Sequence, residues 1–243
     1  NEIEIDYKPT TDTTVHTQLS DATYPQIDIA NASHVVSQVT QPDGIGGDAV
    51  QNYSYTGFKF ERGGRGSLGF KEVEVEDVNQ KTRSVTTYSQ TYPTIGRVLE
   101  SESYITDVND DGTFNDEQLM SETILTYASL DGVTQTSGPD IGYVCVDTRQ
   151  VKQYDLDGAG GSSGLLVTTF TDNDPNSTGA PCDSYGRATI TSVLTTDHTN
   201  SDAEHEVETT RTFNHDTTNW FIGQLTNQIV KQFDDSVGDT ATD

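Results

Sequence analysis

Apolar and polar residues alternate with a period of two through most of this 243-residue sequence. Successive side chains of a β-strand point to opposite faces of a sheet, so this alternation is typical of half-buried strands, whereas an amphipathic helix repeats about every 3.6 residues. The clearest segments are 2–7, 34–41, 52–61, 70–78, 83–92, 97–105, 121–130, 141–155, 164–172, 187–196, 205–214 and 221–233. The pattern therefore predicts about a dozen strands and an all-β fold with almost no helix.

Turn-forming residues separate these segments. Pro42-Asp43-Gly44 is one such signal, because proline and glycine set the backbone angles of a turn and aspartate caps it with its side chain. Short strands joined by such turns predict successive antiparallel hairpins. Residues 115–122, NDEQLMSE, are the one stretch in which we allow a helix.

Composition narrows the classes of partner. Apolar residues make up 31% of the chain, which predicts an open architecture with much wetted surface. The 39 acidic and 13 basic residues give a net charge of −26, which would repel nucleic acid and anionic lipid. We therefore expect no nucleic-acid partner, and the lack of a long apolar run predicts no membrane-spanning segment.

Three glycines, Gly64, Gly66 and Gly69, have the G-x-G-x-x-G spacing of a dinucleotide-binding turn. That turn requires a helix directly after the glycines, because the N-terminus of the helix binds the phosphates. Here residues 70–78 alternate with period two instead. We therefore predict a glycine-rich bend between two strands, in which glycine allows a positive φ or a bulge.

The segment around these glycines is similar to a known family. Residues 53–77, YSYTGFKFERGGRGSLGFKEVEVED, and 86–98, TTYSQTYPTIGRV, resemble the Y-x-Y, GRG-x-LGF and TTY-x-Q-x-(F/Y)P-x-x-G signature of the Rhs/YD-repeat proteins. That family includes the B component of the Tc insecticidal toxins and the SpvB-type virulence proteins. Residues 154–158, 183–193 and 210–234 resemble its YD-type repeats, with an Asn/Asp-x-x-x-Trp-x-x-Gly element that ends at Gly223.

The resemblance implies a β-sheet ribbon that twists and spirals into part of a hollow shell around a passenger polypeptide. It implies one continuous segment of a longer protein, with a GRG-x-LGF region at 1–106 and YD-like repeats at 107–243. The residues that we expect to matter structurally are Tyr53, Tyr55, Gly64, Gly66, Gly69, Phe70, Trp220 and Gly223. The D-P-x-G-L core, where the family cleaves itself, is absent from this sequence.

The expected function is structural and not enzymatic. We expect a segment of a secreted or cell-surface protein whose partners are the remainder of the same polypeptide and an enclosed toxin or effector, or neighbouring copies of itself. One alternative is an extracellular adhesin or filament-forming subunit. A second alternative is a calcium-dependent β protein that acts on polysaccharides.

Three further candidates each have two interpretations. Cys145 and Cys182 either form one disulfide or are two buried thiols. Trp220, the single tryptophan, is expected to be a packing anchor, and the alternative is an exposed platform for a sugar.

The third candidate is a metal site. Asp107, Asn109, Asp111 and Thr113 occupy the first, third, fifth and seventh positions of a calcium-loop pattern, although Gln118 replaces the usual glutamate at the twelfth. The alternative is a solvated hairpin tip whose side chains cap the backbone. We expect no required cofactor, and Ca²⁺ is the one candidate ion.

Overall fold

The structure, a computed structural model, describes residues 2–108, 114–130, 143–155, 164–176, 181–183, 185–199 and 202–234. In these ranges the chain forms sixteen strands and no helix, so the all-β prediction is confirmed. No helix in these ranges could therefore cross a membrane. The chain divides into two compact units, residues 1–121 with 156–163 and residues 122–155 with 164–243.

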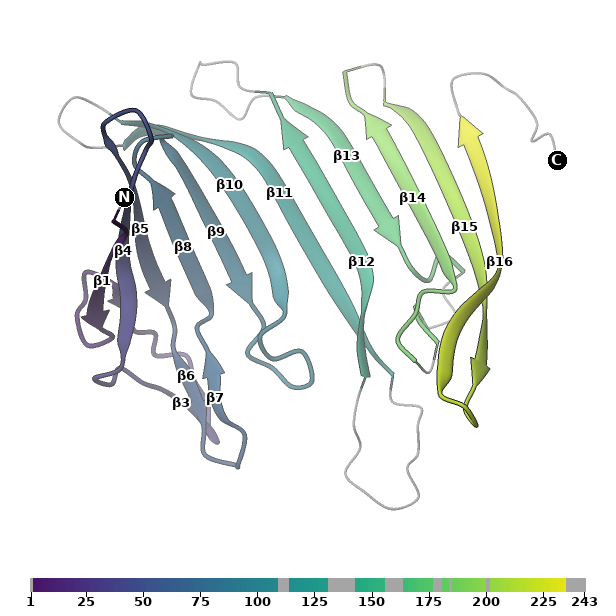
Figure 1. The fold of residues 1–243 in the computed structure, drawn as a ribbon, viewed down its shortest axis with the longest axis horizontal. Helices are drawn as coiled ribbons and strands as arrows, with labels where there is room; N and C mark the ends of the chain where they lie inside the picture. The colour runs from purple at the N-terminus through teal and green to yellow at the C-terminus, as the bar shows by residue number, and fades with distance from the viewer. Residues whose placement is uncertain are drawn as a thin grey trace. The chain divides into compact units, whose positions relative to one another are not determined.

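The first unit contains ten strands and the beginning of an eleventh (Figure 1). They are β1 (Glu4–Pro9), β2 (His16–Thr17), β3 (Gln26–Asp28), β4 (His34–Pro42), β5 (Asp48–Thr56), β6 (Lys59–Glu61), β7 (Gly66–Gly69), β8 (Glu72–Asp77), β9 (Thr82–Tyr88), β10 (Val98–Val108) and β11 (Phe114–Leu130). β3, β6 and β7 form a separate three-stranded sheet at the lower ends of β5 and β8.

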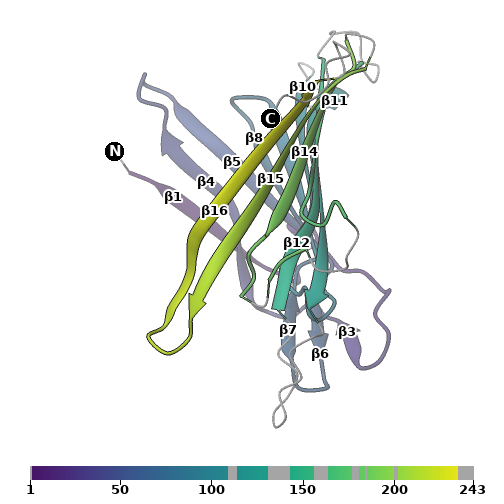
Figure 2. The same ribbon diagram turned by 90° about the vertical axis from the view of Figure 1, so that its right-hand side faces the viewer.

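The second unit contains the rest of β11 and five more strands (Figure 2). They are β12 (Tyr143–Tyr154), β13 (Leu165–Asp172), β14 (Ile190–Asp197), β15 (Ala203–Asp216) and β16 (Phe221–Asp234). The large sheet has the order β1-β4-β5-β8-β9-β10-β11-β12-β13-β14-β15-β16, and β2 pairs in parallel with β5. The pairings of β1 with β4, β4 with β5, β5 with β8, β8 with β9, β9 with β10, and of successive strands from β12 to β16 are antiparallel, as successive hairpins predict.

Two sequence predictions about elements are corrected. Residues 115–122 lie in β11 and not in a helix. An isolated helix of that length is unstable in water, whereas the long strand hydrogen-bonds along its length. The segment 52–61 is not one strand, because Gly57, with φ +70°, ends β5 before β6 begins.

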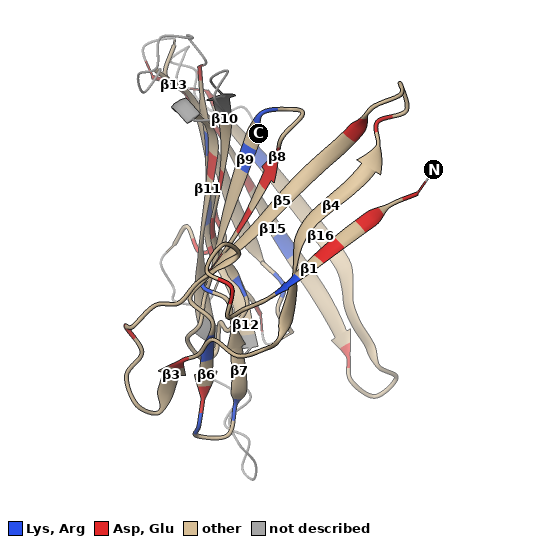
Figure 3. Ribbon diagram, turned by 90° about the vertical axis from the view of Figure 1, so that its left-hand side faces the viewer, with Lys and Arg blue, Asp and Glu red and all other residues tan. Residues whose placement is uncertain are grey.

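Few side chains are buried in this sheet. Among the described residues the buried apolar side chains are those of Val15, Leu68, Val85, Pro181 and Cys182, and most strand residues are half-buried. β8 shows the reason, because its glutamates alternate with Val73 and Val75, so one face is charged and the other apolar. Figure 3 shows acidic residues along several strands of the first unit. The open, wetted architecture that the composition predicts is therefore present.

A cluster of aromatic rings in the first unit surrounds Phe70. Its ring lies 4.7 Å from the ring of Tyr55, 4.8 Å from Phe58 and 5.6 Å from His16, measured between centroids. His16 is buried, and its Nδ1 lies 2.8 Å from the carbonyl oxygen of Thr10. This cluster joins the β2 segment to the small sheet, because aromatic pairs contribute beyond the area that they bury.

Gln90 connects the small sheet to the end of β9. Its Nε2 donates hydrogen bonds to the carbonyl oxygens of Gly57, at 2.7 Å, and of Gly69, at 2.8 Å. These two glycines lie where the chain leaves and re-enters the large sheet. One amide group therefore bonds to two backbone acceptors, and the Gly57 carbonyl also accepts a 3.2 Å hydrogen bond from the N–H of Lys71.

We predict that Gln90→Ala lowers the free energy of unfolding by about 1–3 kcal/mol, because it removes two hydrogen bonds to part-buried backbone carbonyl groups. Urea unfolding of the purified chain measures the change. Gln80→Ala, at an exposed turn position, is the control and should have little effect. Equal stability of the two variants would contradict the role given to Gln90.

Candidate functional site

A row of polar side chains crosses six strands of the first unit. The antiparallel register places residues opposite one another on β1, β4, β5, β8, β9 and β10, and residues directly opposite share a face of the sheet. The members of this polar row are Asp6, Gln38, Asn52, Glu76, Arg83 and Tyr104. Sequence analysis missed the row, because its members come from distant segments and only the register aligns them.

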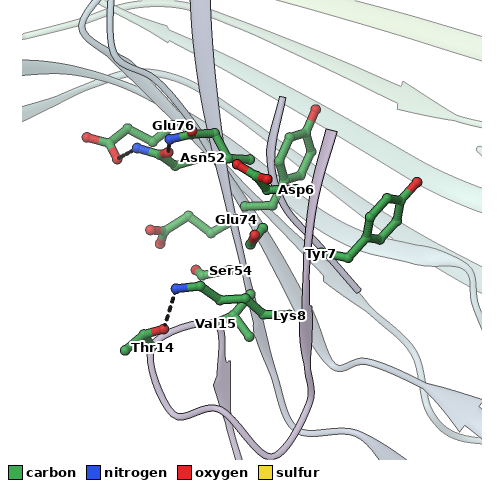
Figure 4. A pocket seen from close by; sticks show the side chains of 12 residues that line it. Asp6, Tyr7, Lys8, Thr14, Val15, Asn52, Ser54, Glu74 and Glu76 are labelled. Atoms are coloured by element: carbon green, nitrogen blue, oxygen red, sulfur yellow. Dashed lines mark hydrogen bonds between the residues drawn. The ribbon is translucent and has the colours of Figure 1, made fainter. Parts of the chain in front are cut away.

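Hydrogen bonds run along the polar row. Gln38 Nε2 donates to Asn52 Oδ1 at 2.9 Å, and Asn52 Nδ2 donates to Glu76 Oε2 at 3.2 Å (Figure 4). Each amide therefore bridges two neighbouring strands through its side chain as well as through its backbone.

A cavity of about 550 Å³ opens over the first part of the polar row. Figure 4 shows Asp6, Glu74 and Glu76 around it, with Lys8 and Thr14 on the opposite side. Lys8 Nζ donates a 2.9 Å hydrogen bond to Thr14 Oγ1. The lining offers carboxylate, amide, hydroxyl and ammonium groups, so it can both donate and accept hydrogen bonds from a polar segment.

Arg83 neutralises carboxylates at the other end of the polar row. Its guanidinium pairs with Glu74, at 2.8 Å between Nη1 and Oε2, and with both carboxylate oxygens of Glu117 on β11. It also lies over the ring of Tyr104, 4.4 Å from the centroid. Burial, together with the hydrogen bond from its hydroxyl to Glu102, raises the pKa of Tyr104 to about 12. Arg83 thus contacts three side chains from three other strands, β8, β10 and β11.

The glycine-rich bend has the conformation predicted from the sequence. Gly64, Gly66 and Gly69 have φ values of +118°, +80° and +81°, and Gly66–Gly69 forms β7 and not the start of a helix. The register between β6 and β7 shifts so that Leu68 has no partner, which is a bulge. The bend therefore lacks the helix N-terminus that a pyrophosphate requires.

The two expected tyrosines lie close to this bend. Tyr55 contacts the ring of Phe70, as described above. Tyr53 is two residues away on β5, and its hydroxyl donates to Gln51 Oε1 at 3.1 Å. Tyr53, Tyr55 and Phe70 thus belong to the first unit, whereas Trp220 and Gly223 lie in the second.

Gly223 allows Arg187 to lie directly against the backbone of β16. A Cβ atom at Gly223 would lie 1.7 Å from Arg187 Cζ, and the backbone has φ +81°. In this position Arg187 Nη2 donates to the carbonyl oxygen of Ile222 at 3.1 Å, and the guanidinium lies 5.4 Å from the Phe213 ring. The glycine of the repeat element is therefore a site of close approach.

Trp220 lies in an exposed turn, and its role as a packing anchor stays a prediction. The residue is 82% exposed and has φ +58° in the turn between β15 and β16. In this turn the side chain is open to solvent. Its exposure leaves the alternative of a platform open.

Cys145 and Cys182 form a disulfide, which is one of the two states that the sequence allowed. The bond joins β12 to the segment before β14 across a sequence separation of 37 residues. Closing a loop of that length stabilises the folded state by about 4 kcal/mol in a chain-entropy treatment.

The predicted calcium loop cannot be placed. Asn109, Asp111 and Thr113 lie outside the described residues, and only the backbone of Asp107, in β10, is described. The calcium site stays a prediction.

No protein-family model and no curated protein matches this chain. Among solved structures, it is similar to the crystal structure of TcdB2-TccC3, a Tc toxin component, with a TM-score of 0.66 over 96% of this chain. The sequence identity is 11%, and the chain covers 15% of that protein. The similarity shows a Tc/Rhs-like fold, and membership of the Rhs/YD-repeat family stays a prediction.

We predict that Gly223→Ala is more destabilising than Gly44→Ala. Both glycines have a φ near +80°, but an added Cβ meets nothing within 4 Å at Gly44 and meets Arg187 at Gly223. The φ penalty, about 1–2 kcal/mol, is common to both, so the difference measures the displaced Arg187 contacts. Urea unfolding provides the values.

Arg187→Ala in the Gly223→Ala background is the control for this difference. The losses in free energy of unfolding from the two substitutions should add to less than their sum, because Gly223→Ala already removes the contacts that Arg187 makes with β16. Full additivity would mean that Arg187 does not require the glycine.

We also predict that Asp147→Asn stabilises the second unit at neutral pH. Burial raises the pKa of Asp147, as do the negative charges of Asp172 and Asp174. The folded state therefore prefers the protonated form of Asp147. It loses stability as the pH rises from the ordinary pKa of an aspartate to the raised pKa of Asp147. The Tm of the variant should exceed that of the unaltered chain at pH 7, and the gain should shrink at pH 3.

Asp155→Asn is the matched control, because it removes one negative charge at an exposed position after β12. Scanning calorimetry at both pH values compares the three proteins. The same gain from Asp155→Asn would point to general charge repulsion and would contradict a local effect at Asp147.

Proposed function

We propose that this chain is a structural, non-enzymatic segment of a secreted or cell-surface Rhs/YD-repeat protein. In this role it forms part of the wall of a β-shell that encloses or presents a toxin or effector. Two findings support the proposal: the sequence signature around the GRG-x-LGF bend, and the fold similarity to part of a Tc toxin component.

The observation that carries the proposal is that β16 has an open edge and exposed apolar side chains. Within the described residues this 14-residue strand pairs only with β15 and ends the strand order of the large sheet. Its exposed apolar side chains are Phe221, Leu225, Ile229, Val230 and Phe233, between 43% and 68% exposed. Isolated sheets usually protect a long edge with charges, prolines or bulges, because an open edge templates aggregation.

The C-terminal half of β16 has little of this protection. Between Asn227 and Asp234 its pairing with β15 is regular, and Lys231 is the one basic residue in the strand. The strand is therefore suited to accept a further strand. In the proposed shell, the next repeat of the same polypeptide supplies it.

The polar row fits the same role. A wall that surrounds a passenger without binding one sequence needs a face that offers many weak hydrogen-bonding groups and no deep apolar pocket. The row and its cavity present such a face in the first unit.

The test is cryo-electron microscopy of the complete polypeptide that contains this chain, together with limited proteolysis. We expect a strand paired with β16, enclosed polypeptide density and a passenger that resists protease. Ile229→Lys should increase cleavage of the passenger, because it places a charge on the apolar part of β16.

Gln228→Lys, the preceding residue on the other face of the same strand, is the control and should leave the passenger protected. A reconstruction with an unpaired β16 and no enclosed chain would contradict the shell. The edge of β16 also favours the alternative of a filament-forming or adhesin subunit, in which a second copy supplies the next strand. Fibres built from contacts between copies at β16 would support that alternative.

The third function, a calcium-dependent protein that acts on polysaccharides, depends on the loop at 107–113. Turnover of an acidic polysaccharide by the purified chain would overturn the non-enzymatic proposal.

A further inference from the structure

A second cavity in the first unit lies beside the glycine-rich bend. Its volume is about 320 Å³, and it is formed by the segment before β3, the β6–β7 hairpin and the segment after β9. The sequence Thr-Tyr-Pro occurs on both sides of it, at 23–25 and at 91–93. Each copy forms a turn, since the N–H of Gln26 bonds to the Thr23 carbonyl and that of Thr94 bonds to the Thr91 carbonyl, both at 2.9 Å.

The two turns present tyrosine rings at the cavity. Tyr24 is 87% exposed and makes no ring contact or hydrogen bond in the described ranges. Tyr92 is 49% exposed, and the guanidinium of Arg65 lies 4.4 Å from its ring centroid. An aromatic ring held open to water beside a cavity is available to pack against the C–H face of a ligand.

The charges in this cavity balance. Glu61 is buried, and both of its carboxylate oxygens accept from Arg65 Nη1, at 3.1 and 3.2 Å. Gly63 leaves room for this pair, because a Cβ there would lie 2.8 Å from Glu61 Oε1. The pair carries no net charge, and the chain as a whole carries −26, so neither feature favours an anionic ligand.

Unused hydrogen-bonding groups surround the ion pair. The hydroxyls of Thr23 and Thr91 and the amide of Gln26 have no partner in the described ranges. Arg65 bonds to Glu61 through Nη1, which leaves Nε and Nη2 as further donors. Hydroxyls both donate and accept, and amides offer a donor and an acceptor, so this lining matches a ligand that is rich in hydroxyl groups.

From these observations we propose that the cavity between the two Thr-Tyr-Pro turns binds a neutral saccharide. Tyr24 packs against one face of a sugar ring, and Gln26, Arg65 and Thr91 bond to its hydroxyls. The cavity is open and has the volume of a small-ligand site, so it accepts a residue within or at the end of a longer glycan. The proposal goes beyond the shell role and does not depend on it.

Isothermal titration calorimetry of the purified 243-residue chain tests the site. The neutral probes are maltohexaose, cellohexaose, mannohexaose and N-acetylchitohexaose, and the anionic probe is hexagalacturonate. We expect at least one neutral probe to bind. Tyr24→Ala should weaken its binding about tenfold, because it removes the aromatic face. Thr91→Val should weaken it too, because it removes a hydroxyl and keeps the shape.

Tyr7→Ala is the matched control, because Tyr7 is an exposed tyrosine at the other cavity of the same unit. It should bind as the unaltered chain does. Thermal unfolding checks that each variant is folded, which we expect since Tyr24, Thr91 and Tyr7 are exposed. Three results would overturn the proposal: no heat with any neutral probe, equal binding by Tyr24→Ala, or tighter binding of hexagalacturonate.

Discussion

Backbone hydrogen bonding between antiparallel neighbours is the interaction on which the rest of this structure depends. A protein of this length usually relies on a buried apolar core, but here few apolar side chains are buried among the described residues. The ladders satisfy the backbone groups, and each half-buried strand residue adds a modest cross-strand contribution. Stability is therefore spread along the sheet, and an edge such as that of β16, which has no second partner strand among the described residues, matters more than it would in a protein with a large buried core.

The same antiparallel pairing places basic side chains beside some of the many acidic ones. On β8 the glutamates share one face, and the register sets Arg83 opposite Glu76 and within reach of Glu74 and Glu117. At Asp147 a cost of burying charge remains, because burial and the charges of Asp172 and Asp174 raise its pKa. A wall with a polar, hydrated face accommodates such charges more easily than a closed core does.

The glycines act at points where the chain must depart from a regular strand. Gly57 and Gly69 mark where the small sheet leaves and rejoins the large one, and Gln90 connects both. In the second unit Gly223 gives Arg187 access to the backbone. The G-x-G-x-x-G spacing thus has a structural cause, since its glycines shape the bend that carries Arg65 to the saccharide cavity proposed above.

By itself the sequence determined the class of fold, most strand positions and the bend, because alternation, turn residues and glycine are local signals. It did not determine β11, where a short helical composition gave way to strand pairing, or the exposure of Trp220, which depends on the path of one turn. Only the tertiary structure aligned Asp6 with Tyr104 across six strands and brought two Thr-Tyr-Pro turns to one cavity. Register and turn packing join residues far apart in the chain, and no local pattern specifies which of them meet.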